Sequence, residues 1–169
     1  MTEPGLERFE DFVALRLPAL YRFALTLTGS PHDAEDLVQE ALVRTGLAWR
    51  RVRRKDAPES YVRMTMTRLM VNRWRRKWRE DPVADVPDRA TVDPALDRIA
   101  DRSYLDSAVR DLPPRMRAVL VLRYLEGLAD EEVAAALGCT VGTVKSQASR
   151  GLAKLRLSLE TEGDRHGRA

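Results

Sequence analysis

The sequence has little of the chemistry that enzymes and metal sites use. Its 169 residues include a single cysteine, Cys139, and two histidines. An internal disulfide is therefore excluded, and a zinc site of the usual kinds is not expected. No nucleophile, base and orienting group fall into a catalytic pattern, and no glycine-rich loop suits a phosphate. We expect no catalytic residue, no metal and no cofactor.

Long hydrophobic runs are also missing. No stretch of about 18 apolar residues occurs, and the N-terminal segment MTEPGLERFEDF has no basic stretch followed by a hydrophobic one. We therefore expect no membrane insertion and a cytoplasmic location. Hydrophobic residues still make up 44% of the chain, which is enough for a folded core.

Charge is distributed unevenly along the chain. Residues 1–43 carry 3 basic against 8 acidic side chains, whereas residues 44–79 carry 13 against 2, a net charge of +11. Residues 80–111 carry 4 against 9, and residues 112–169 carry 9 against 7. A concentrated cationic block is typical of proteins that bind a polyanion such as nucleic acid.

Apolar residues recur with helical spacing almost throughout, and strand-like alternation is nearly absent. We predict an all-α fold of two small helical domains, 1–79 and 94–160, joined by a flexible acidic linker, 80–93, and followed by a frayed tail, 161–169. A basic loop is expected at 50–57. Helices are predicted over about 6–28, from 31 to about 49, and over 58–79, 94–111, 112–127, 130–137 and 141–159. Gly29 fits the C-terminal cap of the first helix, and Ser30 followed by Pro31 fits the start of the second.

Residues 128–156, LADEEVAAALGCTVGTVKSQASRGLAKLR, have helix-turn-helix form. Gly138 permits a turn with positive φ, and Thr140 can cap the second helix. The polar side of that helix offers hydrogen-bond donors for base edges and phosphates. These side chains are Thr143, Lys145, Ser146, Gln147, Ser149, Arg150 and Lys154. The pattern indicates reading of duplex DNA, and the alternative is a helical hairpin with a solvated polar face.

Two further clusters suit binding. In RWRRKWR, residues 73–79, the tryptophans Trp74 and Trp78 stand one helical turn apart among five basic residues, as in surfaces that stack bases and hold phosphates. The alternative is that both tryptophans pack into the core. A row formed by Asp36, Gln39 and Glu40 on the second helix either solubilises that helix or contacts a partner.

Three segments together resemble a known family. They are SPHDAEDLVQEALVRTGLAW, PESYVRMTMTRLMVNRWRRKW and LPPRMRAVLVLRYLEGLADEEVAAALGCTVGTVKSQASRGLAKLR. In this order, and over nearly the whole chain, they are similar to the extracytoplasmic-function (ECF) sigma factors of bacteria, most of all to the actinobacterial SigE-like branch. The chain departs from many members at Arg68, where they have asparagine, and at Ala129, where they have serine or threonine.

The resemblance implies that 1–79 is sigma region 2 and 94–160 is sigma region 4. Asp36, Gln39 and Glu40 would then contact the β′ clamp helices of core RNA polymerase, and a surface around 122–128 would receive the β flap. The −10 element would be bound by Arg53, Arg54, Lys55, Arg68, Asn72, Trp74, Arg75 and Arg76. The −35 element would be read by Thr143, Lys145, Ser146, Ser149 and Arg150, while Arg115, Arg117 and Arg123 would hold phosphates.

The expected function is that of an alternative sigma factor. Such a protein binds core RNA polymerase, directs promoter-specific initiation on duplex and single-stranded DNA, and aids strand opening by capturing bases. One alternative is a free-standing helix-turn-helix regulator that binds duplex DNA without polymerase. Another is a protein that occupies polymerase, or is held by an anti-sigma factor, without productive initiation. A nucleic-acid enzyme is disfavoured because only Asp56 and Glu59 are acidic within residues 44–79.

Overall fold

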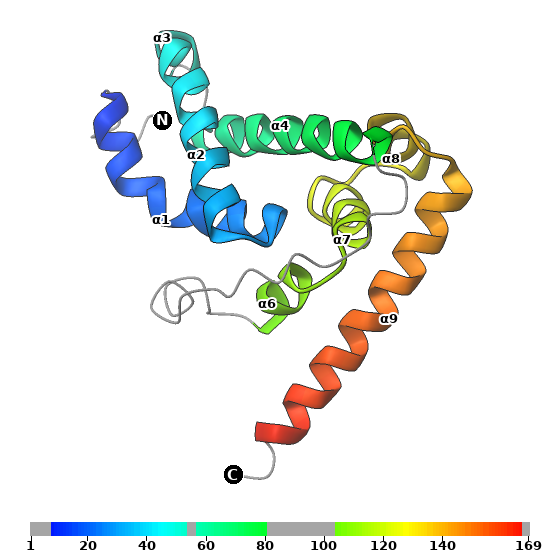
Figure 1. Cartoon of the computed structure of the whole chain (residues 1–169). Coiled ribbons are helices and arrows are strands. Elements are labelled where there is room, and N and C mark those ends of the chain that lie inside the picture. Colours follow the sequence, from blue (N-terminus) through cyan, green and yellow to red (C-terminus); the bar gives the residue numbers. More distant parts are fainter. Residues whose placement is uncertain (1–7, 54–56, 81–103, 167–169) are drawn as a thin grey trace.

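A group of packed helices forms the N-terminal half of the chain in this computed structural model (Figure 1). The structure describes residues 8–53, 57–80 and 104–166, and all regular structure within them is helical. The N-terminal half, residues 8–80, contains α1 (Phe9–Thr28), α2 (Pro31–Leu47), α3 (Trp49–Val52) and α4 (Pro58–Glu80). Within the described residues, the predicted all-α class is confirmed.

The turn between α1 and α2 follows from its local sequence. Gly29 adopts a positive φ of 73° and its N–H donates to the Leu25 carbonyl at 2.8 Å, which closes α1. The Ser30 hydroxyl accepts from the Asp33 N–H at 3.5 Å, and Pro31 occupies the first helical position of α2. These capping signals, read from the sequence, are confirmed.

The C-terminal half, residues 104–166, holds the predicted helix-turn-helix. Its elements are α6 (Tyr104–Arg110), α7 (Pro114–Leu120), a π-helical turn η1 (Val121–Leu125), α8 (Asp130–Leu137) and α9 (Val141–His166). Gly138 has a φ of 68° and ends α8, and the Thr143 N–H donates to the Thr140 hydroxyl at 3.1 Å to begin α9. α9 extends well away from the other helices at its C-terminal end (Figure 1).

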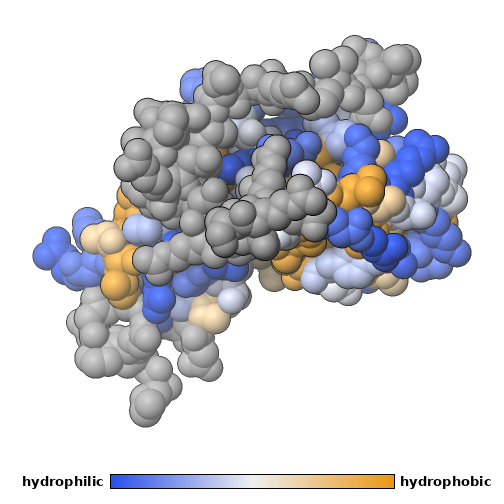
Figure 2. All heavy atoms as spheres, turned by 90° about the horizontal axis from the view of Figure 1, so that it is seen from below, coloured by the Kyte–Doolittle hydropathy of each residue, from blue (hydrophilic) through white to orange (hydrophobic). Residues whose placement is uncertain are grey.

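The hydrophobic core runs through both halves. In the N-terminal half, α1 packs on α2 and both pack on α4, while in the C-terminal half α6, α7 and α8 pack on α9. The two halves also contact each other, because α1 packs against α6 and α7, and α4 packs against α8. Seen from below, the described surface is largely hydrophilic, with hydrophobic side chains gathered in a few patches (Figure 2).

Two boundaries differ from the sequence prediction. The basic loop expected at 50–57 begins with the helical turn α3, because Trp49 packs against Phe9 and Phe12, with ring centroids 5.4 and 5.1 Å away, and Val52 is buried. α9 continues to His166, so the tail is helical further than expected. After Glu80, the predicted linker lies outside the described residues, as does most of the helix predicted over 94–111.

Candidate nucleic-acid interface

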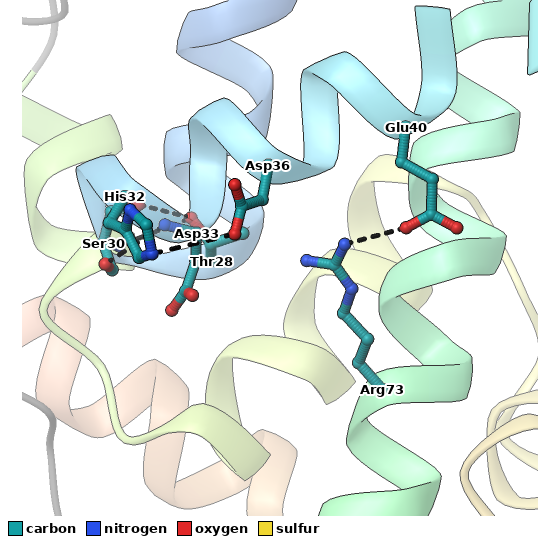
Figure 3. Close-up of polar contacts among 7 residues, drawn as sticks. All are labelled: Thr28, Ser30, His32, Asp33, Asp36, Glu40 and Arg73. Atoms are coloured by element: carbon teal, nitrogen blue, oxygen red, sulfur yellow. Dashed lines mark hydrogen bonds and ion pairs between the residues drawn. The ribbon is translucent and has the colours of Figure 1, made fainter. Parts of the chain in front are cut away.

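α2 exposes an acidic face above a buried apolar one. Its buried side is formed by Ala34, Leu37, Val38 and Ala41. Asp36 and Gln39 are exposed on the opposite side, and Glu40 beside them is half-buried. His32 lies one turn before Asp36, with its Nε2 3.8 Å from the Asp36 carboxylate (Figure 3). The structure therefore brings together the three α2 residues that the sequence singled out.

Glu40 is held by two arginines. The Arg73 Nη2 reaches from α4 and donates to Glu40 Oε2 at 3.0 Å (Figure 3), while the Arg44 Nη2 donates to Oε1 at 2.9 Å. These contacts, the Arg73 hydrogen bond first, lower the pKa of Glu40 below its ordinary value. The acidic face of α2 is thus tied directly to the basic segment of α4. The sequence placed Arg73 in the basic cluster 73–79 but did not pair it with Glu40, because only the fold brings the two together.

α4 presents a row of exposed polar side chains on one face. They are Arg68, Asn72, Arg75 and Arg76. Their spacing of four, three and one residues places them on one side of a helix, while Val62, Met66 and Leu69 are buried on the other. This face carries fixed positive charge and amide donors, which suits a nucleic-acid backbone and its bases.

Trp74 does not belong to that exposed face. Its side chain is 3% exposed, and its ring stacks on Trp78 with centroids 6.2 Å apart and an interplanar angle of 2°. Burial leaves Trp74 no open face on which a base can stack in this arrangement, and its role in −10 binding stays a prediction. The two tryptophans continue the buried side of α4, as the alternative interpretation of the sequence held.

The basic segment after α3 is described only in part. Arg53 is exposed at the end of α3. Arg54 and Lys55 lie outside the described residues, so their predicted role stays a prediction. Arg50 and Arg51 are exposed on α3, directly before Arg53, and add to the positive charge at this end of the N-terminal half.

α9 carries the predicted recognition face. Lys145, Ser149 and Arg150 are exposed, and Thr143 and Ser146 are half-buried beside them. The Ser146 hydroxyl donates to the Thr143 carbonyl at 3.3 Å. The buried side of the helix is formed by Val144, Gln147, Ala148 and Leu155. The five residues therefore share one accessible face near the N-terminal end of α9, the part of a recognition helix that contacts bases.

Two polar residues, Gln147 and Arg117, are placed differently from the sequence prediction. Gln147 is 8% exposed, so it faces the core instead of the polar side of α9. Arg117 is 6% exposed, its Nη2 donates to the Leu112 carbonyl at 3.0 Å, and burial lowers its pKa to about 10. It cannot hold a phosphate in this arrangement. Arg123 pairs with Asp130 at 3.1 Å.

The described residues include no group of three metal-ligating side chains, and none of their helices is long and apolar enough to cross a membrane. Cys139 is half-buried, and burial raises the pKa of its thiol. Formation of the reactive thiolate at Cys139 is therefore disfavoured. What the described surface offers is two separate helical faces rich in donors, on α4 and α9, and one acidic face on α2.

Comparison with known proteins gives a consistent result. Residues 12–80 match the family described as sigma-70 region 2, and residues 102–155 match the family described as sigma-70, region 4. The RNA polymerase sigma-E factor of Streptomyces avermitilis is 44% identical over 154 residues, which cover 90% of this chain and 86% of that protein. The ECF RNA polymerase sigma factor SigE of Mycolicibacterium smegmatis is 34% identical and is covered over 62% of its length.

A solved structure is also similar. The sigma factor RpoE of Bartonella quintana, crystallised in complex with the anti-sigma factor NepR, matches with a TM-score of 0.55 and 27% identity. The match covers 90% of this chain and 96% of that one. The likeness therefore extends over both halves of the chain.

Proposed function

Because the chain belongs to the ECF RNA polymerase sigma factors, we propose that its three exposed faces divide promoter recognition among them. The chain is an alternative sigma factor, which joins RNA polymerase and directs transcription initiation at promoter DNA. A free-standing regulator is not favoured, because both sigma regions match in one chain. Sigma factors are not enzymes, and we assign the chain no catalytic role.

The α9 face reads the −35 element in the major groove. Lys145 and Arg150 are exposed cations near the helix N-terminus, where a recognition helix approaches base edges. Thr143, Ser146 and Ser149 are short, so the helix backbone can come close to the DNA. This accessible, capped helix is the observation that supports the proposal most strongly.

The α4 face binds the −10 element. Arg68, Asn72, Arg75 and Arg76 are exposed in one row, and cations in such a row can follow a single-stranded backbone. Arg53, with Arg54 and Lys55, belongs to the segment proposed to capture a flipped base. Unpairing and unstacking a base costs a few kcal/mol, which several such contacts can offset. Strand opening would then be driven by binding energy.

The α2 face contacts core RNA polymerase. Asp36, Gln39 and Glu40 form an acidic patch suited to the β′ clamp helices, and the Arg73 contact fixes Glu40 in place. Tyr124 and Leu125 are 56% and 59% exposed on η1 and form the apolar surface proposed for the β flap. An anti-sigma factor is a further proposed partner, since the similar RpoE structure was solved with one.

Two substitutions separate these roles. Asp36→Lys reverses charge on the α2 face and is expected to weaken association with core polymerase at least about tenfold, as loss of a charged interface pair does. Arg150→Ala removes a base-edge donor and is expected to reduce use of the normal start sites while leaving association intact. Pull-down with core polymerase and mapping of transcript starts in vitro measure the two effects.

Matched controls are available on exposed positions. Glu131→Lys makes the same charge reversal on α8, and Arg156→Ala removes a cation from α9 farther from its N-terminus. Both should behave like the unaltered protein. If Arg150→Ala left the choice of start sites unchanged, the assignment of α9 as the −35 reader would be wrong.

A further inference from the structure

Within the described residues, the arginines of α4 divide into those that have a partner in the protein and those that have none. Arg63 forms an ion pair with Glu59 at 3.0 Å. Arg73 donates to the Glu40 carboxylate at 3.0 Å. Arg68 lies between these two arginines on the same helix, and it is exposed. Its guanidinium makes no ion pair, hydrogen bond or ring contact with the described residues, so its N–H donors are available to a ligand.

The surroundings of Arg68 are partly apolar. Met64, one turn before it, is exposed, and Val71, three residues after it, is half-buried. Both line a hollow of about 500 Å³ together with Arg68 and Asn72. Spacings of four, three and one residues place these four side chains on one side of α4. DNA bases make apolar contacts as well as hydrogen bonds, whereas a phosphate is held by charge and hydrogen bonds. This part of α4 therefore suits a base.

The cations farther along α4 have different surroundings. Arg75, Arg76, Lys77 and Arg79 are all exposed, and the hollow beside Arg68 is lined by none of them. They follow one another within one and a half turns of the helix, so their positive charge is concentrated at its C-terminal end. A DNA strand carries a negative charge on every phosphate, which such a concentration of cations neutralises. This part of α4 therefore suits the backbone of the strand.

The guanidinium of Arg68 matches one base better than the others. Its parallel N–H donors fit the O6 and N7 acceptors of guanine, which is the commonest specific contact that arginine makes with a base. Adenine and cytosine present an amino donor at the same edge, which opposes a guanidinium. Thymine presents a single acceptor beside a methyl group. An unpartnered Arg68 next to apolar side chains is thus suited to guanine.

Asn72 adds a second group that can read a base. It lies one turn after Arg68, is exposed, and has no hydrogen-bond partner among the described residues. Its amide offers one donor and one acceptor, which match N7 and N6 of adenine. Four residues rise about 6 Å along a helix, and successive bases of a strand lie about 3.4 Å apart. Arg68 and Asn72 can therefore reach neighbouring bases of one strand.

We propose that Arg68 selects a guanine within the −10 element, while Arg75 and Arg76 hold the strand through its phosphates. This inference rests on the proposed function, which places the −10 element on α4, and adds to it the base that this chain prefers. The two roles have different consequences. Loss of a base contact relaxes specificity at one position, whereas loss of a phosphate contact weakens binding by a similar factor for every sequence.

The test uses the full chain with core RNA polymerase and a set of promoters in which each −10 position carries each base in turn. Initial rates of transcription in vitro give the base preference at each position. The unaltered protein should prefer guanine at one of them. Arg68→Ala should reduce that preference about 5- to 150-fold, the range of one bidentate base contact, and leave distant positions unchanged. Arg68→Gln should also reduce it, because an amide has a single donor nitrogen.

Arg75→Ala is the matched control, because it removes the same charge from an exposed position of the same helix. It should lower the rate from all promoters of the set by a similar factor and keep the preference for guanine. Circular dichroism and pull-down with core polymerase check that each variant folds and assembles. The comparison therefore separates a base contact from a general loss of charge.

Two results would overturn the inference. One is an unaltered protein that shows no preference for guanine at any −10 position. The other is an Arg68→Ala protein that loses activity equally at every promoter of the set, which would make Arg68 a phosphate contact like Arg75. In both cases, transcripts that depend on the protein still support the sigma assignment. Absence of such transcripts at every promoter would contradict the proposed function and, with it, the role of Arg68.

Discussion

At the scale of single residues, Glu40 connects the face proposed for polymerase with the helix proposed for DNA. Arg73 of α4 donates to its carboxylate at 3.0 Å and holds the pKa of Glu40 below its ordinary value of 4.5. Because the pKa of Glu40 is lower in the folded than in the unfolded protein, the ionised carboxylate contributes its full stabilisation at pH values above the unfolded pKa. That contribution is lost as the pH falls through the folded pKa.

Arg73→Met is therefore expected to raise the pKa of Glu40 toward 4.5, because the largest cause of the shift is removed. The part of the acid-induced loss of stability that comes from Glu40 should become smaller, while the contribution of the Arg44 contact remains. Titration of the Glu40 carboxyl carbon by NMR measures the change. Arg76→Met removes an exposed cation from the same helix and should leave the pKa of Glu40 where it is.

Gly29 and Gly127 form a second residue-level comparison. Both have positive φ, 73° and 68°, so alanine at either position is strained by about 1–2 kcal/mol. At Gly29 the new Cβ also meets the Arg117 guanidinium, whereas nothing lies within 4 Å at Gly127. Urea unfolding should show a larger loss for Gly29→Ala than for Gly127→Ala. Equal losses would mean that the Arg117 contact contributes nothing.

At the scale of elements, helix ends were the most predictable feature. Ser30 and Pro31, Gly29, Gly138 and Thr140 each act through their own backbone or a neighbour three or four residues away, so the sequence alone locates them. α8 and the beginning of α9 match their predicted bounds for this reason. Local chemistry decided these boundaries.

Features that depend on distant residues were not predictable in the same way. α3 forms inside a predicted loop because Trp49 packs on Phe9 and Phe12, about forty residues earlier in the chain. The residues of the exposed row on α4 were named from the resemblance to the family, but the burial of Trp74 was left open between two interpretations. Arg117 looked like a surface cation until the fold placed it beside Gly29.

The burial of Trp74 gives an element-level prediction. Trp74→Ala removes a buried indole from α4 and should lower the free energy of unfolding by about 3–5 kcal/mol. Trp78→Ala should have a smaller effect, because Trp78 is only half-buried. Denaturant unfolding measures both. A Trp74→Ala protein of normal stability that binds single-stranded DNA poorly would restore the stacking role.

At the scale of the whole molecule, the uneven charge of the sequence corresponds to the positions of the helices. The block of residues 44–79, with a net charge of +11, folds into the end of α2, α3 and α4, and its exposed arginines gather on faces that suit DNA. Within the described residues, the C-terminal half partly covers those faces. Both of the helices proposed to bind DNA thus belong to one short chain, in which α4 of the N-terminal half packs against α8 of the C-terminal half.

Run-off transcription from fragmented genomic DNA of the source organism, with sigma-free core polymerase, tests the sigma assignment most directly. Adding the protein should produce transcripts that start at discrete new sites, with shared sequence elements upstream of them. The same transcripts with and without the protein, together with sequence-specific binding of duplex DNA in the absence of polymerase, would contradict the assignment and favour a free-standing regulator.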